Sequence, residues 1–240
     1  MEKFEGQRAV LRGETAEHLG RVLRAEPGQL YELSDGEKVW LGRVEHVGRS
    51  GRSGAGIEFA LVEPVAVEES KLRIRLLISI VKFDRFEWCL EKATELGVAE
   101  IIPLAASRSE KALVQAATKR AERWRKILLE SAQQARCLRP PSLAAVSKPE
   151  EAFKACGEGT KILLSERREA KPIRELLGGT SAREVVLTIG PEGGWTDDEF
   201  AAAEKYGFKE ASLRKQILRT ETAVIAALAI VHYALADSST

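Results

Sequence analysis

The spacing of apolar and polar residues changes character near residue 70. Before that point, short segments alternate apolar and polar positions, which is typical of half-buried strands. Two such segments flank an Asp-Gly pair within Gln29–Val47 and predict a hairpin, and Ile57–Val65 predicts a further strand. A helix is expected at Thr15–Arg24, with Thr15 as its N-cap, because apolar residues recur there at helical spacing. This pattern predicts a small β-barrel with one helix.

After residue 70, apolar runs of strand length alternate with longer segments of helical periodicity. Such alternation indicates a mostly parallel sheet covered on both faces, so the fold class is α/β. The charged segment Glu68–Lys71 separates the two patterns and predicts one domain at 1–70 and a second at 71–240. The second domain should contain strands at 72–81, 98–105, 161–165, 184–190 and 210–213, and helices at 84–96, 113–137, 196–206 and 222–236.

Two of the expected helices begin with a possible capping box, in which two side chains reciprocally satisfy backbone N–H groups. Asp84 pairs with Glu87 in the first of these helices, and Thr196 pairs with Glu199 in the second. A glycine follows each of the two helices, where it reaches the left-handed conformation without steric cost. These signals predict where both helices start and stop.

Composition excludes several classes of protein. The 240 residues are 44% hydrophobic and 30% charged, which is ordinary for a soluble globular protein. No basic segment followed by an apolar run opens the chain, so no signal peptide is expected. The most apolar stretch, Ala223–Ala236, is too short to span a bilayer and contains His232, which predicts a buried core helix. Three widely spaced cysteines predict reduced thiols and a cytoplasmic location.

A glycine-rich turn follows the expected strand at 184–190 and leads into the next helix. Strand, glycine turn and helix is the usual geometry of a phosphate site, but Pro191 has no N–H to donate and the Glu192 carboxylate repels phosphate. Gly193 and Gly194 allow close approach of the backbone to a ligand. The turn therefore suits a neutral or cationic ligand, and a purely structural turn with an exposed glutamate is the equal alternative.

A second candidate segment is Leu213–Ala223, which connects the short strand at 210–213 to the last helix. Arg219 and Glu221 place charges between an apolar strand and an apolar helix. The simpler interpretation is an exposed helix cap with an Arg–Glu pair. In an open α/β sheet, however, ligands bind beyond the carboxyl ends of the strands. This segment and the glycine turn both follow strands, so both could line one crevice.

Basic residues are concentrated in Lys119–Arg139, which holds seven of them against two glutamates. A solvated helix face is the favoured interpretation of such a run, and a phosphate-contacting surface is the alternative. Gln133 and Gln134 at the end of the same helix could contact RNA or form a polar face, and periodicity favours the face. The three histidines show no spacing of metal ligands.

Five segments together resemble the 16S ribosomal RNA (uracil-N3) methyltransferase family, RsmE, of the SPOUT superfamily. The match covers nearly the whole chain in family order. Its most specific part is the combination of GPEGG in the glycine turn with ILRTETA some 30 residues later. The matching segments read HLGRVLR, KATELGVAEIIPL, ESAQQARCLRPP, TIGPEGGWTDDE and LRKQILRTETA.

The resemblance implies a fold, a reaction and partners. Residues 1–70 should form a PUA-like β-barrel that binds RNA, and residues 71–240 a SPOUT domain with a trefoil knot. The reaction would be S-adenosylmethionine-dependent methylation of uridine N3 in 16S ribosomal RNA of the small ribosomal subunit. The enzyme would be a cytoplasmic homodimer that needs no metal and no membrane.

The resemblance also assigns residues to roles. Arg219 would stabilise charge on the uracil oxygens, and Glu221 would act as base or orient Arg219. Three loops would gather around the cofactor. The cofactor-binding residues would be Leu164, Ser165, Gly190, Pro191, Glu192, Gly193, Leu213, Ile217, Leu218, Arg219 and Thr220, and the RNA-binding residues Arg24, Arg120, Arg123, Lys126 and Arg136.

This chain departs from the family pattern at Arg214, where glycine is usual, at Gln216, where a basic residue is usual, and at Gln133, where glutamate is expected. These departures bear on the cofactor contacts. Two rival functions stay open, namely another SPOUT activity such as ribose 2′-O methylation of RNA, and RNA binding without catalysis. A nucleotide-binding α/β protein is disfavoured by the proline and the glutamate of the glycine turn.

Overall fold

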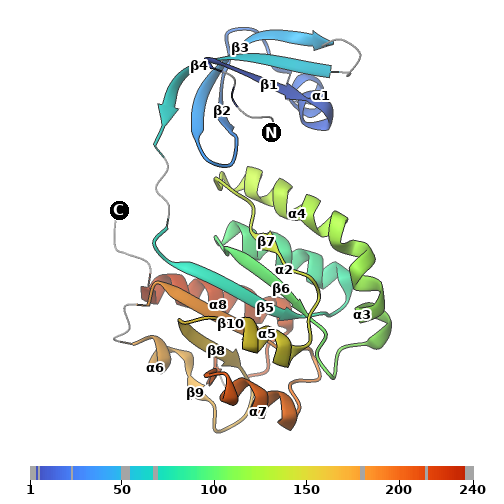
Figure 1. The fold of residues 1–240 in the computed structure, drawn as a ribbon, viewed down its shortest axis with the longest axis vertical. Helices are drawn as coiled ribbons and strands as arrows, with labels where there is room; N and C mark the ends of the chain where they lie inside the picture. Colours follow the sequence, from blue (N-terminus) through green and yellow to red (C-terminus); the bar gives the residue numbers. More distant parts are fainter. Residues whose placement is uncertain are drawn as a thin grey trace. The chain divides into compact units, whose positions relative to one another are not determined.

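The computed structural model describes residues 4, 6–22, 24–49, 55–66, 70–178, 182–213 and 216–235. The chain divides into two compact units, Met1–Glu69 and Ser70–Thr240, which Figure 1 draws and which are described separately below. Arg214 of the predicted cofactor loop lies outside the described residues.

The first unit is a four-stranded antiparallel sheet with one helix. Its strands lie in the order β1-β4-β3-β2, and two register shifts between β3 and β4 mark bulges, which curve the sheet. Side chains from every strand and from the helix form its apolar core, with Ile57 and Phe59 each 1% exposed. The elements are β1 (Arg8–Arg12), α1 (Gly13–Arg21), β2 (Leu30–Ser34), β3 (Val39–Arg49) and β4 (Ala55–Val65).

The predicted hairpin is confirmed, and the predicted helix cap is wrong. Strands β2 and β3 pair across the turn, where Asp35 Oδ1 accepts hydrogen bonds of 2.8 Å from the backbone N–H groups of Glu37 and Lys38. Helix α1 begins two residues before Thr15, directly after β1, and its N-cap makes no side-chain hydrogen bond. Gly13, at φ +70°, lets the chain turn straight from strand into helix, so no separate capping residue is used.

The second unit contains a seven-stranded parallel sheet with the order β7-β6-β5-β10-β8-β11-β9, which confirms the predicted α/β class. The strands are β5 (Arg73–Ser79), β6 (Glu100–Leu104), β7 (Ser142–Leu143), β8 (Thr160–Leu164), β9 (Lys171–Pro172), β10 (Glu184–Ile189) and β11 (Lys209–Ser212). The helices are α2 (Phe83–Glu95), α3 (Lys111–Ala117), α4 (Ala121–Gln134), α5 (Pro149–Ala155), α6 (Ile173–Leu177), α7 (Asp197–Lys205) and α8 (Thr220–Leu235).

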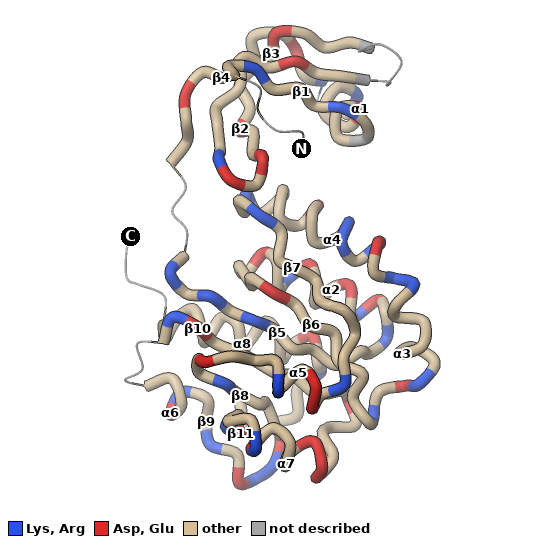
Figure 2. Tube along the Cα trace, viewed as in Figure 1, with Lys and Arg blue, Asp and Glu red and all other residues tan. Residues whose placement is uncertain are grey.

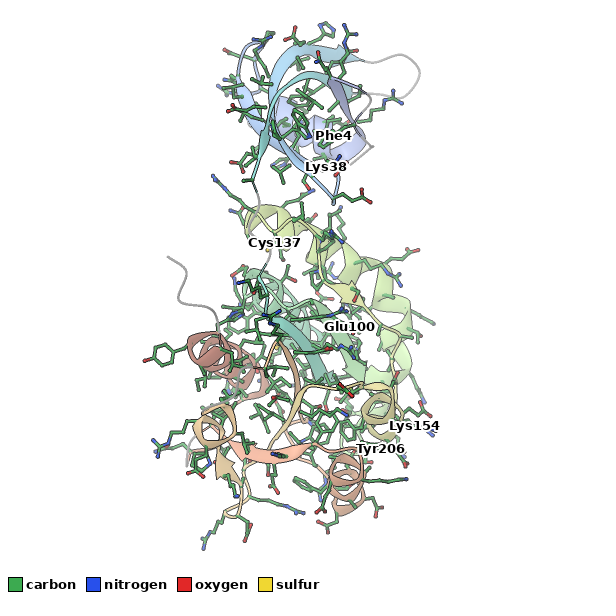
Figure 3. All side chains as sticks on the ribbon, turned by 60° about the vertical axis from the view of Figure 1, so that its left-hand side comes forward. Phe4, Lys38, Glu100, Cys137, Lys154 and Tyr206 are labelled. Carbon is green, nitrogen blue, oxygen red and sulfur yellow. The ribbon has the colours of Figure 1, made fainter. Side chains whose placement is uncertain are left out.

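Helices cover both faces of this sheet, as the alternation of elements predicts. Leu76 of β5 belongs to a core shared with α2, α4, α6 and α8. Leu77, the next residue, belongs to a second core shared with α5 and α7, because successive strand residues point to opposite faces. Lys154 and Tyr206, labelled in Figure 3, lie near the ends of α5 and α7. The trefoil knot stays a prediction, because strand order alone does not determine how the chain is threaded.

Local signals succeed at some helix ends and fail at others. Thr196 and Glu199 form the predicted capping box of α7, and Gly97 and Gly207 follow their helices at φ +70° and +81°. The capping box predicted for α2 is wrong, because its N-cap is Lys82 and makes no side-chain hydrogen bond. The single helix expected at 113–137 is two helices, α3 and α4, joined by a 3₁₀ turn at Thr118–Arg120.

Candidate active site

A cavity of about 600 Å³ lies beyond the carboxyl ends of the central strands of the second unit. It is lined by the last residues of β8 and β10 and by the segments that follow β8, β10 and β11. This is the edge of a parallel sheet at which ligands bind in open α/β folds. The structure brings together every residue assigned to cofactor binding, namely Leu164, Ser165, Gly190, Pro191, Glu192, Gly193, Leu213, Ile217, Leu218, Arg219 and Thr220.

The glycine turn between β10 and α7 is tightly packed. The N–H of Gly194, at φ +70°, donates a 2.8 Å hydrogen bond to the carbonyl of Pro191. A Cβ atom added at Gly190 would lie 2.9 Å from the ring of Trp195, which is closer than real Cβ atoms approach. A Cβ atom added at Gly193 would lie 3.2 Å from the Cβ of Arg108. Glycine is therefore required by sterics at 190 and by conformation at 194.

Arg108 is a site residue that no sequence pattern singles out. It lies in the segment after β6, lines the cavity, and donates a 2.8 Å hydrogen bond from Nη1 to the carbonyl of Gly193. The neighbouring Ser107 N–H donates a 2.8 Å bond to Glu199 Oε1, so the same segment also holds the start of α7. The sequence gives no local sign of this role, because the partner of Arg108 is 85 positions away along the chain.

Trp195 forms a buried part of the cavity wall and joins two of its loops. The side chain is 5% exposed, and its Nε1 donates a 3.0 Å hydrogen bond to the carbonyl of Leu164 at the end of β8. A buried indole usually needs such a partner for its N–H. Trp195 therefore fixes the glycine turn relative to the segment after β8.

A cation and an aromatic ring form another part of the wall. Arg167, Asp197 and Phe200 all line the cavity, and none is predicted from sequence. The guanidinium of Arg167 lies 3.6 Å from the centroid of the Phe200 ring and also pairs with Asp197. Contact with an aromatic face and with a carboxylate orders an arginine at the rim of a site.

The segment between β11 and α8 carries the predicted catalytic arginine. Arg219 is exposed, lines the cavity, and within the described part of the chain its guanidinium has no hydrogen bond or ion pair. Thr220 is 4% exposed, and its hydroxyl donates a 3.5 Å hydrogen bond to the carbonyl of Gly190. The side chain of Ile217 is 77% exposed, and Gln216 also lines the cavity.

Glu221 is placed differently from Arg219. It is not among the cavity-lining residues, and its Oε1 lies 3.9 Å from the Nε of Arg85 on α2. Its Oε2 is buried without a hydrogen-bond partner among the described residues. Burial and the nearby charge of Glu221 raise the pKa of the Cys89 thiol to about 12, so this cysteine is an inert core residue. Within the described residues, Glu221 therefore contacts Arg85, and no Arg219–Glu221 pair is present.

The basic residues assigned to RNA binding are partly engaged in ion pairs. Figure 2 shows Lys and Arg along α4 and the turn before it. Arg120 and Arg123 both donate to the carboxylate of Glu87, at 2.8 to 3.0 Å, and these hydrogen bonds lower the pKa of that carboxyl group. Lys126 lies 3.9 Å from Glu130. Arg24 and Arg136 have positive φ angles of 50° and 55°. Contact of these residues with RNA stays a prediction.

The described residues hold no cluster of side chains that could bind a metal ion. No three histidine, cysteine, aspartate or glutamate side chains in this part of the chain are grouped as metal ligands would be. Within the same residues, no helix has the length and apolar character needed to cross a membrane.

Comparison with known proteins places the chain beside RNA-modifying enzymes. The family described as "RNA methyltransferase domain" matches residues 68–232. A "Ribosomal RNA small subunit methyltransferase E" from Synechocystis is 33% identical over 90% of this chain and 69% of its own length. A protein with the same name from Aquifex aeolicus is 27% identical over 96% of both chains.

Solved structures agree with the sequence relatives. A ribosomal RNA small subunit methyltransferase E from Neisseria gonorrhoeae, bound to S-adenosylmethionine, is 32% identical with a TM-score of 0.84, covering 99% of this chain and 97% of its own. A structure from Legionella pneumophila, also with bound S-adenosylmethionine, has the same identity and TM-score and covers 99% and 96%.

Proposed function

We propose that this chain, which belongs to the ribosomal RNA small subunit methyltransferase E family, transfers a methyl group from S-adenosylmethionine to N3 of a uridine in 16S ribosomal RNA. The observation that carries the proposal is the cavity at the strand ends, where all the predicted cofactor residues meet. The similarity to structures that hold this cofactor, over 99% of the chain, supports it.

The residues around the cavity fit S-adenosylmethionine, which has a cationic sulfonium and no phosphate. The lining combines aliphatic side chains such as Leu164, Ile189 and Leu213 with charged ones, and the glycine turn lets the backbone approach a ligand closely. Pro191 offers no N–H to a phosphate, and the carboxylate of Glu192 is paired with Arg85, so the turn lacks the donors of a phosphate site and suits a ligand without phosphate. We propose that the turn Gly190–Gly194 and the segment Leu213–Thr220 hold the cofactor, which when bound supplies an electrophilic methyl group.

Arg219 is the residue we propose to act on the substrate. N3 of uracil carries a proton and lies in the base-pairing edge, so the base must be exposed before it reacts. Loss of that proton to a base places negative charge on the two carbonyl oxygens attached to the ring carbons on either side of N3. A guanidinium at the cavity, without an ion-pair partner among the described residues, can donate hydrogen bonds to such an oxygen. Glu221 does not line the cavity and contacts Arg85 in place of Arg219, so we propose neither that it is the base nor that it orients Arg219 by direct contact.

RNA binding would extend beyond the cavity. We propose that the four-stranded unit at residues 1–70 is a PUA-like RNA-binding domain, and that Arg24, Arg120, Arg123, Lys126 and Arg136 contact phosphates. Counterion release would then make binding salt-dependent. The small ribosomal subunit would be the partner and the cytoplasm the location.

We propose that the enzyme is a homodimer joined through α8. The sequence predicts a buried helix here, and one side of α8 is buried, with Val224, Leu228 and Val231 each 0% exposed. Its other side carries Tyr233, which is 93% exposed, and α2 beside it carries Trp88, which is 41% exposed. A helix this apolar with an uncovered face is typical of a subunit interface.

The decisive experiment is methylation of small ribosomal subunits or their RNA by the purified protein with labelled cofactor, followed by digestion to nucleosides. We expect the label in 3-methyluridine. Label in a 2′-O-methylated nucleoside would support the rival SPOUT activity. RNA binding without cofactor binding or label would support a non-catalytic RNA-binding protein.

A further inference from the structure

Arg85 contacts two loops of the candidate active site without lining the cavity itself. It lies in the first turn of α2. Its Nη1 pairs with Glu192 of the glycine turn, and its Nε lies 3.9 Å from Glu221 at the start of α8. The side chains of Arg85 and Glu221 are 28% and 16% exposed, so their contact is partly shielded from solvent, whereas the side chain of Glu192 is 52% exposed.

The two carboxylates need a cation between them. Glu192 and Glu221 come from separate loops, and their negative charges would repel each other without Arg85. The charge of Glu221 depends more on Arg85 than that of Glu192 does, because the other carboxylate oxygen of Glu221 is buried without a hydrogen-bond partner among the described residues. Removing one partner from a shielded ion pair leaves a charge that is costly to keep inside.

The position of Glu221 also determines the position of the residues before it. Thr220 is the first residue of α8 and bonds to Gly190, and Arg219 immediately precedes it. Two sets of contacts therefore join the glycine turn to the start of α8. The first is the hydrogen bond from Thr220 to Gly190, and the second is the pair of ionic contacts that Arg85 of α2 makes with Glu192 and Glu221.

We propose that Arg85 is a positioning residue that fixes the position of Glu192 relative to the start of α8, so that the glycine turn and Arg219 face one cavity. This inference rests on the function proposed above. Arg85 touches neither cofactor nor substrate, and its effect passes through the two carboxylates. Losing it would release Glu192 and let the segment bearing Arg219 shift.

The first test compares Arg85→Ala and Arg85→Lys with a matched control, Lys92→Ala. Lys92 is on the same helix and also bridges two carboxylates, but its partners Glu91 and Glu95 lie on α2 itself and not in the loops of the cavity. Titration calorimetry with S-adenosylmethionine and single-turnover methylation are measured on variants shown to be folded by circular dichroism. We expect Arg85→Ala to weaken cofactor binding about tenfold and to lower the rate further, since residues in direct contact couple by such amounts.

Arg85→Lys keeps the charge and loses the fork of donors, so it should recover part of both losses, and Lys92→Ala should match wild type. If Arg85→Ala also matches wild type, the inference is overturned. If wild type itself binds no cofactor, the proposed function has failed instead, so the two failures are distinguishable.

The second test asks whether Arg85 acts through Glu192. Glu192→Gln removes the charge from the other side of the pair and keeps the size of the side chain. The effect of Arg85→Ala on cofactor affinity should shrink by about threefold or more in the Glu192→Gln protein, because contacting residues are not additive. If Arg85→Ala lowers cofactor affinity by the same factor in the Glu192→Gln protein as in wild type, Arg85 does not act through Glu192. Should Arg85→Ala fail to fold, Arg85→Lys combined with Glu192→Gln provides the same comparison.

Discussion

Arg108 holds Gly193 in two ways. Its Nη1 donates a 2.8 Å hydrogen bond to the Gly193 carbonyl, and its Cβ lies 3.2 Å from where a Cβ at 193 would be. The segment after β6 thus packs against the glycine turn, and a side chain at 193 would require Arg108 to move by a few tenths of an ångström. This contact joins two parts of the chain that are 85 positions apart. Its role in cofactor binding can therefore be tested by substituting either Gly193 or Arg108.

Gly193→Val should reduce affinity for S-adenosylmethionine strongly. The added side chain must displace Arg108 or move the turn, because a branched Cβ makes the contact worse than alanine would. Calorimetry on the folded variant measures the effect. The control is Gly157→Val, since a Cβ at Gly157 meets nothing within 4 Å. Wild-type affinity in Gly193→Val would refute this site for the cofactor.

Arg108→Ala should weaken cofactor binding by roughly tenfold, because a hydrogen bond from a charged group contributes on the order of 1.5–3 kcal/mol. The loss comes from a turn that is no longer held at the Gly193 carbonyl. Quenching of Trp195, which lines the cavity, offers an independent readout of binding. An affinity equal to wild type would mean that the backbone alone keeps the turn in place.

Arg219→Ala should lower the single-turnover rate on a small-subunit substrate by about 10²–10³, the usual loss for one such donor. Cofactor affinity, measured separately, should change far less. Arg219→Lys keeps the charge but not the planar fork, so it should restore the rate in part. A near-normal rate for Arg219→Ala would remove this residue from the mechanism, and a loss due wholly to weaker cofactor binding would make it structural.

Removing Arg120, Arg123 and Lys126 together should flatten the dependence of log affinity for RNA on log salt. Every phosphate that the variant no longer neutralises should reduce the slope by about 0.7–0.9. Two of these arginines share Glu87, so the total change should be smaller than three independent phosphate-binding residues would give. The control removes Lys154, Lys205 and Lys209, which are exposed on other elements. An unaltered slope would identify the α4 face as solvated surface.

Glu87 should make stability depend on pH in the acid range. Arg123 and Arg120 lower the pKa of its carboxyl group below the unfolded value of about 4.3. A lowered pKa gives stabilisation that is complete above the unfolded value and is lost as pH falls through the folded value. Urea unfolding at neutral pH should show Glu87→Gln to be less stable than wild type, and the difference should shrink at pH values below about 4. A difference that is independent of pH would contradict the ion pair.

The sequence by itself determined the features that depend on neighbouring residues and on periodicity. The hairpin at Asp35, the capping box from Thr196 to Glu199 and the helix-ending glycines follow from hydrogen bonds and backbone conformation within a few positions. Alternation of strand and helix determined the parallel sheet. Because a parallel sheet has all its carboxyl strand ends at one edge, the strand-end loops had to meet, and all the predicted cofactor residues line one cavity.

The tertiary structure decided which distant side chains meet. Arg85, Arg108 and Trp195 join the cavity loops through partners 107, 85 and 31 positions away, and no local pattern distinguishes them from ordinary surface or core residues. Glu87 is an example, since the sequence predicts that it caps α2, whereas the helix begins at Phe83, too early for Glu87 to be in the capping position, and its carboxylate pairs with two arginines from the segment at α4. Arginine–carboxylate hydrogen bonds of this kind are charge-assisted, and their partners come together only once the helices are packed.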